Sequence, residues 1–319
     1  MMTASVPTPV PPPASTAAPL RYAHALSVTR GAWWRGLLAI VVYGVAFFVV
    51  SVVIGGIGLL VETANGGVTA EQLASGVIPL TPLVLLTTNL SLALTIPVAM
   101  LLQWAFFGVR PRMLSSVEGR FRWGWLGRLA VVIVPIWVLY IVVLFVFSPE
   151  GAFRFDGTVL AFVLIVLLTT PLQAAGEEYG LRGLVQRSVG SWFRGPRVAI
   201  VVSTIVSATL FGVIHFAGDP WLIAYYILFG AAMSIAAHAT GGLEAPVLIH
   251  AVNNALIFLP AAFLGGLDEG IDRSMGAGGP FMLLPMAVVL LGAVVAWRWA
   301  RRAGVTVAAV PPPPRYPRR

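Results

Sequence analysis

Eight long apolar stretches, separated by short polar or arginine-rich segments, limit what this chain can fold into. A helix of about 20 apolar residues crosses the hydrocarbon core of a bilayer, because each residue adds ~1.5 Å along the helix axis. The stretches lie approximately at 36–61, 80–107, 125–147, 158–189, 198–216, 220–238, 243–264 and 281–300. The sequence therefore predicts an all-α, polytopic membrane protein with about eight transmembrane helices.

The composition agrees with a protein that lies in a membrane. Hydrophobic residues make up 58% of the chain and charged residues only 10%, whereas a soluble domain is about 25% charged. The absence of cysteine excludes disulfides and thiolate chemistry. The net charge of +8 is compatible with nucleic-acid binding, but the arginines cluster beside apolar stretches. That distribution is typical of membrane topology, so no nucleic-acid partner is expected.

The arginines also predict the orientation of the chain. They precede the first apolar stretch and follow the second, fourth and eighth, whereas the alternate segments carry mainly Asp and Glu, with Arg154 and Arg273 as exceptions. Basic loops stay on the cytoplasmic side of a membrane, so we expect both termini in the cytoplasm. All 20 basic residues are arginine. Because a lysine-free composition is typical of GC-rich bacterial genomes, we expect a bacterial cytoplasmic membrane.

The fourth stretch contains three ionisable residues, in the sequence GEEYGLRG at 176–183. One ionisable residue in hydrocarbon costs at least ~2.5–3.5 kcal/mol on insertion scales, so this group needs partners and usually has a function. Glu178 and Arg182 are i,i+4 neighbours on a helix and can pair. Glu177 lies ~100° away around the helix, because an α-helix has 3.6 residues per turn. We predict that Glu178 and Arg182 neutralise each other and that Glu177 faces a cavity.

Two further apolar stretches carry polar pairs at helical spacing. Phe211 and His215 share a face of the fifth stretch, and His250 and Asn254 share a face of the seventh. A lone histidine or asparagine in such a place is more often a hydrogen-bonding group between helices than a catalyst. Together with Glu177, however, these residues supply a base for water and donors for an oxyanion. The set suits attack by an activated water on an amide carbonyl.

The three segments resemble the family of intramembrane proteases called CPBP or Abi, which includes the type II CAAX prenyl endopeptidases. The resemblance covers roughly 171–258. The family motifs E-E-x-x-x-R, F-x-x-x-H and H-x-x-x-N match Glu177, Glu178 and Arg182, then Phe211 and His215, then His250 and Asn254. The resemblance implies that Glu177 and His215 hold and activate the water, whereas His250 and Asn254 form the oxyanion hole. Asp219 departs from the family, since some prenyl endopeptidases carry asparagine at that position.

A metal-dependent mechanism is an alternative. Glu177, His215 and His250 are a usable set of zinc ligands, and the family was first described as metalloproteases. The sequence contains no H-E-x-x-H motif, and the oxyanion role already uses one histidine. We therefore favour glutamate-based catalysis without a metal, and keep zinc as the alternative cofactor.

The sequence does not determine how His215 and His250 could come close to each other. His215 lies eighteen residues after Arg197, or roughly 27 Å along a straight helix, whereas His250 lies only a few residues into its stretch. Either the fifth helix enters the bilayer late and tilts, or the histidines meet in a deep cavity.

Three functions compete at this stage. The first is an intramembrane endopeptidase that acts on a membrane-associated peptide or protein. The second is a non-enzymatic scaffold or bacteriocin-immunity protein, which would leave Glu177 without a purpose. The third is a proton-coupled transporter, which would require two matching halves that the sequence lacks. We favour the endopeptidase, with a transmembrane protease domain at 31–303 between disordered proline-rich tails at 1–30 and 304–319.

Overall fold

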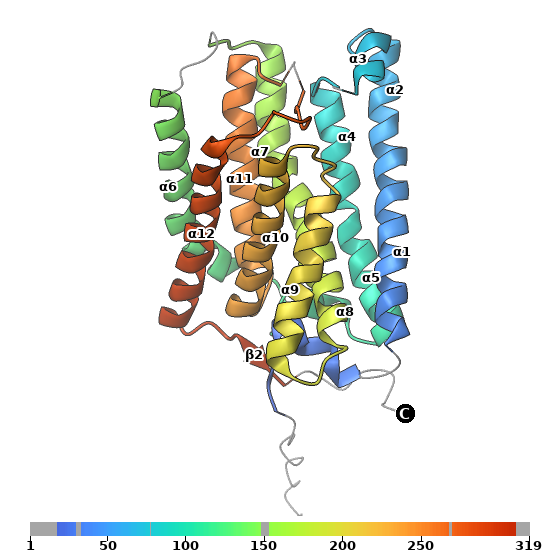
Figure 1. Ribbon diagram of the computed structural model, residues 1–319, viewed down its shortest axis with the longest axis vertical. Coiled ribbons are helices and arrows are strands. Elements are labelled where there is room, and N and C mark those ends of the chain that lie inside the picture. The colour runs from blue at the N-terminus through green and yellow to red at the C-terminus, as the bar shows by residue number, and fades with distance from the viewer. Residues whose placement is uncertain (1–17, 30–32, 77, 148–152, 268–269, 311–319) are drawn as a thin grey trace, which may run out of the picture.

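The protein is a bundle of long helices that run roughly parallel to one axis (Figure 1). The computed structural model describes residues 18–29, 33–76, 78–147, 153–267 and 270–310. Within these residues, eight helices are long and apolar enough to cross a membrane, which confirms the predicted all-α fold. These candidate spans are Trp34–Ala64, Pro82–Phe107, Trp123–Leu144, Gly157–Gly190, Pro196–Val213, Pro220–Thr240, Glu244–Leu264 and Pro280–Arg302.

The first three spans contain most of the N-terminal half of the bundle. The first span is interrupted by one π-helical turn, and the second by a break between two helices. In chain order the elements are α1 (Trp34–Val50), η2 (Ser51–Gly55), α2 (Gly56–Ala64), α3 (Ala70–Ser75), α4 (Pro82–Ala93), α5 (Thr95–Phe107), η3 (Pro111–Leu114) and α6 (Trp123–Phe147).

The fourth span is the longest of the eight and carries the paired glutamates. It joins two α-helices through a π-helical segment, in which hydrogen bonds run to the fifth residue instead of the fourth. From here to the last span the elements are α7 (Gly157–Glu178), η4 (Tyr179–Val185), α8 (Gln186–Gly190), α9 (Pro196–Val213), α10 (Pro220–Thr240), α11 (Glu244–Leu264), η5 (Pro280–Met282) and α12 (Leu283–Arg302).

Local sequence signals determine where several spans begin and end. The Asp156 carboxylate accepts a hydrogen bond from a backbone N–H in the first turn of α7, and Asp219 does the same for α10. Such caps satisfy N–H groups that have no partner within the helix. Gly241 and Gly265 end α10 and α11 in the left-handed conformation, with φ of 73° and 81°, which glycine adopts without steric cost.

The fourth span is packed tightly against its neighbours through two glycines. A Cβ atom at Gly176 would lie 1.9 Å from the backbone oxygen of Leu92 in α4, and one at Gly180 would lie 1.8 Å from the Tyr43 hydroxyl of α1. Such contacts are far shorter than van der Waals distance, so only glycine permits this approach. The paired glutamates are therefore held against α1, α4 and α5 in the interior of the bundle.

The segment before the first span differs from the expected disordered tail. Leu20–Arg21 (β1) pairs antiparallel with Ala308–Ala309 (β2), and Tyr22–Thr29 (η1) forms a 3-10 helix with mostly buried residues. The Tyr22 hydroxyl donates to the carbonyl of Leu114, and its ring lies under the Arg187 guanidinium. These contacts order residues that proline-rich composition assigns to a tail. The expected tails at 1–17 and 311–319 lie outside the described residues.

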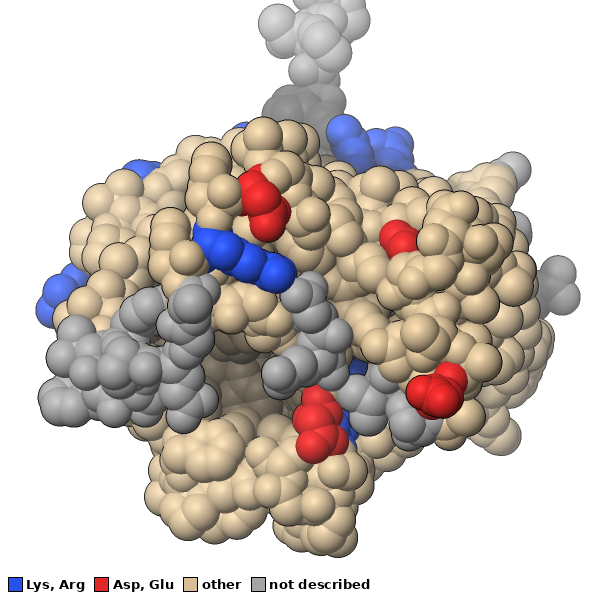
Figure 2. Space-filling model, turned by 90° about the horizontal axis from the view of Figure 1, so that it is seen from above, with Lys and Arg blue, Asp and Glu red and all other residues tan. Residues whose placement is uncertain are grey.

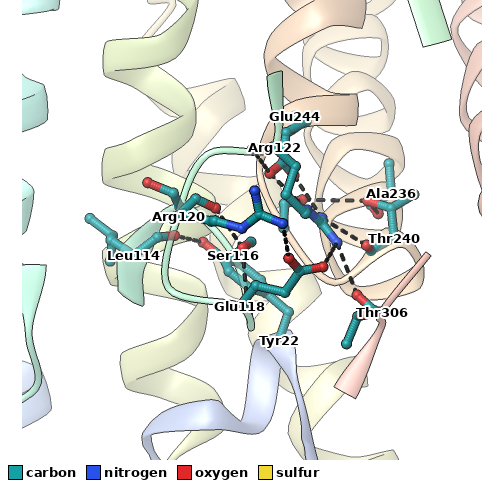
Figure 3. Close-up of polar contacts among 12 residues, drawn as sticks. Tyr22, Leu114, Ser116, Glu118, Arg120, Arg122, Ala236, Thr240, Glu244 and Thr306 are labelled. Carbon is teal, nitrogen blue, oxygen red and sulfur yellow. Dashed lines mark hydrogen bonds and ion pairs between the residues drawn. The ribbon is translucent and has the colours of Figure 1, made fainter. Parts of the chain in front are cut away.

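A buried ion pair ties together the segments at the end of the bundle where β1 and β2 lie (Figure 3). The Arg122 guanidinium binds both carboxylate oxygens of Glu244, with Nε–Oε1 and Nη2–Oε2 distances of 2.9 and 2.7 Å. It also donates to the carbonyls of Thr240 and Thr306. The pair thus joins the segment before α6, the turn between α10 and α11, and the segment after α12.

Candidate active site

A cavity of about 760 Å³ brings the sequence-predicted residues together. Glu177, His215, His250 and Asn254 all line it, as does Phe211. Most of its other lining residues are apolar, and they include side chains of α4, α10 and α11. A cavity with apolar walls and a few convergent polar groups is the usual form of a binding or catalytic site.

The cavity extends toward the end of the bundle opposite β1 and β2. Its lining includes Gly76 and Ile78 from the segment before α4, and Ile271 from the segment after α11. Seen from that end, the surface is hollowed, with both acidic and basic side chains on the same face (Figure 2). Glu177 lies twenty residues into α7, or roughly 30 Å from the first residue of that helix. The polar groups therefore lie deep, and the mouth faces away from β1 and β2.

The Glu178 and Arg182 side chains form the ion pair expected from their spacing, outside the cavity lining. Arg182 Nη1 lies 3.0 Å from Glu178 Oε1, and both side chains are fully buried. Arg182 also donates to the carbonyl of Gly230 in α10, and its guanidinium lies 4.5 Å from the centre of the Phe211 ring. Phe211 therefore supports the arginine from the cavity side. The pair neutralises two charges that would each be costly alone in the interior.

The Glu177 carboxylate has one oxygen fixed and one oxygen without a partner. Oε1 accepts a hydrogen bond of 2.7 Å from Gln173 Nε2 on the preceding turn. Oε2 is buried and has no hydrogen-bond partner among the described residues. Its nearest ion-pair contact is His250 Nε2, at 3.8 Å, which is too long for a direct hydrogen bond. A buried carboxylate oxygen in a cavity is well placed to accept a proton from water.

His215 follows the end of α9, and its ring orientation is set by the helix itself. Its Nδ1 lies 2.6 Å from the carbonyl oxygen of Phe211, which can only accept a hydrogen bond. Nδ1 must therefore carry a proton, and in the neutral ring Nε2 is an acceptor. The ring stacks on Tyr226 of α10, with 3.9 Å between ring centres. The neutral histidine can thus accept a hydrogen bond from a water in the cavity.

His250 lies between the two glutamates. Its Nδ1 is 2.8 Å from Glu178 Oε1, and its Nε2 faces Glu177 Oε2. Because the arginine-paired Glu178 carboxylate accepts, Nδ1 donates. In the neutral ring Nε2 then has no proton, so His250 can donate toward the cavity only when the ring is protonated. The rings of Phe211 and Phe229 contact it edge-on and fix its plane.

Gln173 links Asn254 to Glu177 and was not predicted from the sequence. Its Nε2 donates to Glu177, and its Oε1 accepts a hydrogen bond of 3.1 Å from Asn254 Nδ2. Asn253 also lines the cavity, where its oxygen accepts from Tyr225. The available signal was the spacing of Gln173, one turn before Glu177 in an otherwise apolar stretch.

A displacement of α9 along the bundle axis explains how the two histidines meet. In Figure 1, α9 begins beyond the start of α11 on the side of β1 and β2, and ends about halfway along it. His215 follows that end, whereas His250 lies six residues after the start of α11, or roughly 9 Å along it. Both side chains therefore reach the same cavity. Late entry of the fifth helix and a deep cavity, which the sequence left as alternatives, thus occur together.

The alternative zinc site does not form in this geometry. Among the residues that the structure describes, no group of three His, Asp or Glu side chains converges so that it could hold a metal ion. Glu177, His215 and His250 share one cavity. The Nδ1 atom of His250, however, is hydrogen-bonded to Glu178, and its Nε2 atom lies 3.8 Å from Glu177 Oε2. The arrangement presents hydrogen-bonding partners for a water rather than three ligands at one point.

One protein-family model matches the part of the chain that carries these residues. Residues 158–256 match the family model "Type II CAAX prenyl endopeptidase Rce1-like". This part of the chain is similar to an Rce1-like domain. The matched residues contain α7 to α10 and the first part of α11, so they include Glu177, His215, His250 and Asn254.

One curated relative also matches part of the chain. The uncharacterized protein YyaK of Bacillus subtilis (strain 168) is 27% identical over 122 residues, which cover 35% of this chain and 40% of YyaK. The match therefore spans less than half of that relative. No solved structure matches the chain. The Rce1-like domain belongs to a family of intramembrane proteases, and this chain is an integral membrane protein with eight candidate spans.

Proposed function

We propose that this chain is an intramembrane endopeptidase, which hydrolyses a peptide bond of a membrane-associated peptide or protein with a water activated by Glu177. The observation that carries this proposal is the Glu177 Oε2 atom. It is buried in the cavity, lacks a hydrogen-bond partner among the described residues, and shares that cavity with His215, His250 and Asn254. A scaffold has no use for an unpartnered carboxylate oxygen, which is costly to bury.

The first step uses the acceptors of the site. A water bound between Glu177 Oε2 and His215 Nε2 gives a proton to Glu177 as its oxygen attacks the carbonyl carbon of the peptide. The carbonyl double bond opens, and its oxygen becomes an oxyanion. The Nδ1–H group of His215 stays hydrogen-bonded to the carbonyl of Phe211 throughout, so Nε2 remains available as an acceptor.

The second step uses the donors. Asn254 has a second N–H besides the one that Gln173 accepts. His250, after taking up a proton from solvent before the attack, donates from Nε2 while its Nδ1–H remains hydrogen-bonded to Glu178. These two donors stabilise the oxyanion. The C–N bond then breaks, and Glu177 passes the proton to the leaving amine. No metal takes part in this sequence of steps.

The position of the mouth determines how the substrate enters. The cavity opens at the end away from β1 and β2, which the positive-inside rule assigns to the non-cytoplasmic side. The substrate enters from the outer half of the membrane or from the outer surface, with both termini of the chain in the cytoplasm.

The test is cleavage by the purified protein. Full-length chain in detergent is incubated with a mixture of apolar peptides, and the products are identified by mass spectrometry. We expect cleavage by the wild type and none by Glu177→Gln, which keeps the shape of the side chain and removes the base.

The control is the thermal unfolding midpoint of both proteins. Glu177→Gln should unfold within a few degrees of the wild type, because Gln173 can still bind the new amide. Cleavage that persists in Glu177→Gln would contradict the assignment of the base, and no cleavage by either protein would contradict the proposed function.

A further inference from the structure

One cationic side chain lines the cavity, and the mechanism above does not use it. Arg273 belongs to the segment between α11 and α12 and is the only arginine or lysine among the described residues that line the cavity. It also lines a second opening of about 600 Å³, which it shares with Glu177 and His215. The described residues place no carboxylate within ion-pair distance of its guanidinium. Among the described residues, no carboxylate therefore competes with an anion for its positive charge.

Arg273 is close to the reacting groups. Its Nε donates to the Tyr226 hydroxyl over 3.4 Å, and Tyr226 stacks on His215. One aromatic ring therefore separates the guanidinium from the histidine that holds the water in the proposed mechanism. Because an extended peptide advances ~3.3–3.6 Å per residue, a group bound at Arg273 lies a few residues from the cleaved bond.

The segment that carries Arg273 is fixed to the start of α10. The Arg273 carbonyl accepts from the backbone N–H of Gly218 at 2.8 Å, and Asp219 accepts from the backbone N–H of Gly276 at 3.0 Å. Asp219 is the residue that departs from the family pattern, and here it joins two segments. The neighbouring Asp272 is occupied by its own segment, because its carboxylate accepts from the Ser274 N–H.

We propose that Arg273 binds a carboxylate of the substrate and thereby selects where the chain is cut. This inference rests on the proposed peptidase function. Arginine binds carboxylates through two parallel hydrogen bonds, and such bonds are stronger where water is largely excluded. The carboxylate belongs either to the C-terminus of the substrate or to an Asp or Glu side chain near the cleaved bond. The apolar walls bind the remaining residues, so the substrate is an apolar peptide with one acidic group.

The experiment measures binding separately from cleavage. Full-length protein with Glu177→Gln, which removes the base, is titrated with a dansyl-labelled apolar hexapeptide in three forms. These are the free acid, the C-terminal amide, and the amide with one internal Asp. The same titrations are made after adding Arg273→Gln, Arg273→Lys or, as a control outside the cavity, Arg298→Gln.

We expect an acidic form to bind about tenfold more tightly than the neutral amide, a ratio that corresponds to ~1.4 kcal/mol. Arg273→Gln should abolish this preference, Arg273→Lys should retain part of it, and Arg298→Gln should leave it unchanged. Preference for the free acid identifies the C-terminal carboxylate, and preference for the Asp peptide identifies a side chain.

Three results would overturn the inference. They are equal binding of all three peptides, a preference that survives Arg273→Gln, and displacement of the acidic peptide by phosphatidylglycerol, which would assign Arg273 to lipid headgroups. Cleavage by the wild-type protein is scored independently. A chain that binds the acidic peptide through Arg273 but cleaves nothing would contradict the proposed function alone.

Discussion

Glu178 accepts hydrogen bonds from two side chains in the interior, Arg182 and His250. Glu178→Gln removes the negative charge and leaves Arg182 buried without its counter-ion. Loss of one partner of a buried pair typically costs ~3–5 kcal/mol, so we expect a lower yield of folded protein and a lower unfolding midpoint. Size-exclusion chromatography and thermal unfolding in detergent measure both.

The matched comparison is Glu177→Gln. In the wild-type protein the Glu177 carboxylate accepts a hydrogen bond from Gln173 and does not neutralise an arginine. That variant should fold with normal yield. If Glu178→Gln gave normal protein while Glu177→Gln failed to fold, the two carboxylates would have exchanged roles.

Asn254 separates the glutamate mechanism from the zinc alternative. In the proposed mechanism its contact with the substrate is made only to the developing oxyanion. Asn254→Ala should therefore lower kcat by ~10²–10³ with little change in KM. Purified active protein should contain less than one zinc per chain, and prolonged chelation should leave most of the activity. One zinc per chain, lost with activity on chelation and restored with it, would establish a metalloprotease instead.

At the scale of residues, the sequence predicted which groups meet but not how they are linked. Helical spacing sufficed for Glu178 with Arg182, and three motifs together predicted the lining of the cavity. Tyr226 carries no such signal. The spacing of Gln173, one turn before Glu177, does not by itself identify its bonds, since one polar residue in an apolar stretch has many possible partners. The roles of Glu177, His215, His250 and Asn254 stay predictions until the variants are measured.

At the scale of elements, Gly176 determines how closely α4 approaches α7. Gly176→Ala would place a methyl group against the Leu92 carbonyl, which is backbone and cannot rotate away. Overpacking of this kind typically costs 1–3 kcal/mol, so we expect the unfolding midpoint to fall.

Gly44→Ala in α1 is the control, because a Cβ at that position meets no atom within 4 Å. Its midpoint should stay unchanged or rise slightly, since alanine favours a helix more than glycine does. Equal effects of the two substitutions would mean that the contact with α4 contributes nothing.

The boundaries of the spans were predictable because length and hydropathy determine them, and the eight candidate spans confirm them within a few residues. The π-helical segment at Tyr179–Val185 was not predictable. It adds a residue to the turn after the paired glutamates, and π-helical turns often occur at functional sites. Apolar sequence alone does not distinguish such a turn from an α-helical one. The displacement of α9 along the bundle axis depends on packing between helices, so it was not predictable from the sequence either.

At the scale of the whole molecule, the orientation in the membrane is open to a direct test. A reporter enzyme that is active only outside the cytoplasm is fused after Ala277, between α11 and α12, or after Gly304, beyond α12. We expect activity from the first fusion and none from the second, because the positive-inside rule places the end of the bundle with β1 and β2 in the cytoplasm. The same signal from both fusions would contradict the eight-span topology.

Composition did not predict the contacts of Tyr22 and Arg122 at the end of the bundle where β1 and β2 lie. Proline-rich sequence suggested a tail up to residue 30, but aromatic and polar side chains such as Tyr22 find partners only in the folded bundle. Likewise Glu244 bonds Arg122 across a long separation in sequence, and local patterns do not report such pairs.

The pairing of β1 with β2 has a consequence for biosynthesis. Leu20–Arg21 is translated before every described span, and Ala308–Ala309 after all of them. At ~5–20 residues per second, the first segment waits many seconds at the ribosome for its partner. Helices can enter the membrane one by one during that time, but β1 and β2 can pair only after the last described span has been translated. The pairing of these two segments is therefore a late step in assembly, which follows insertion of the described spans.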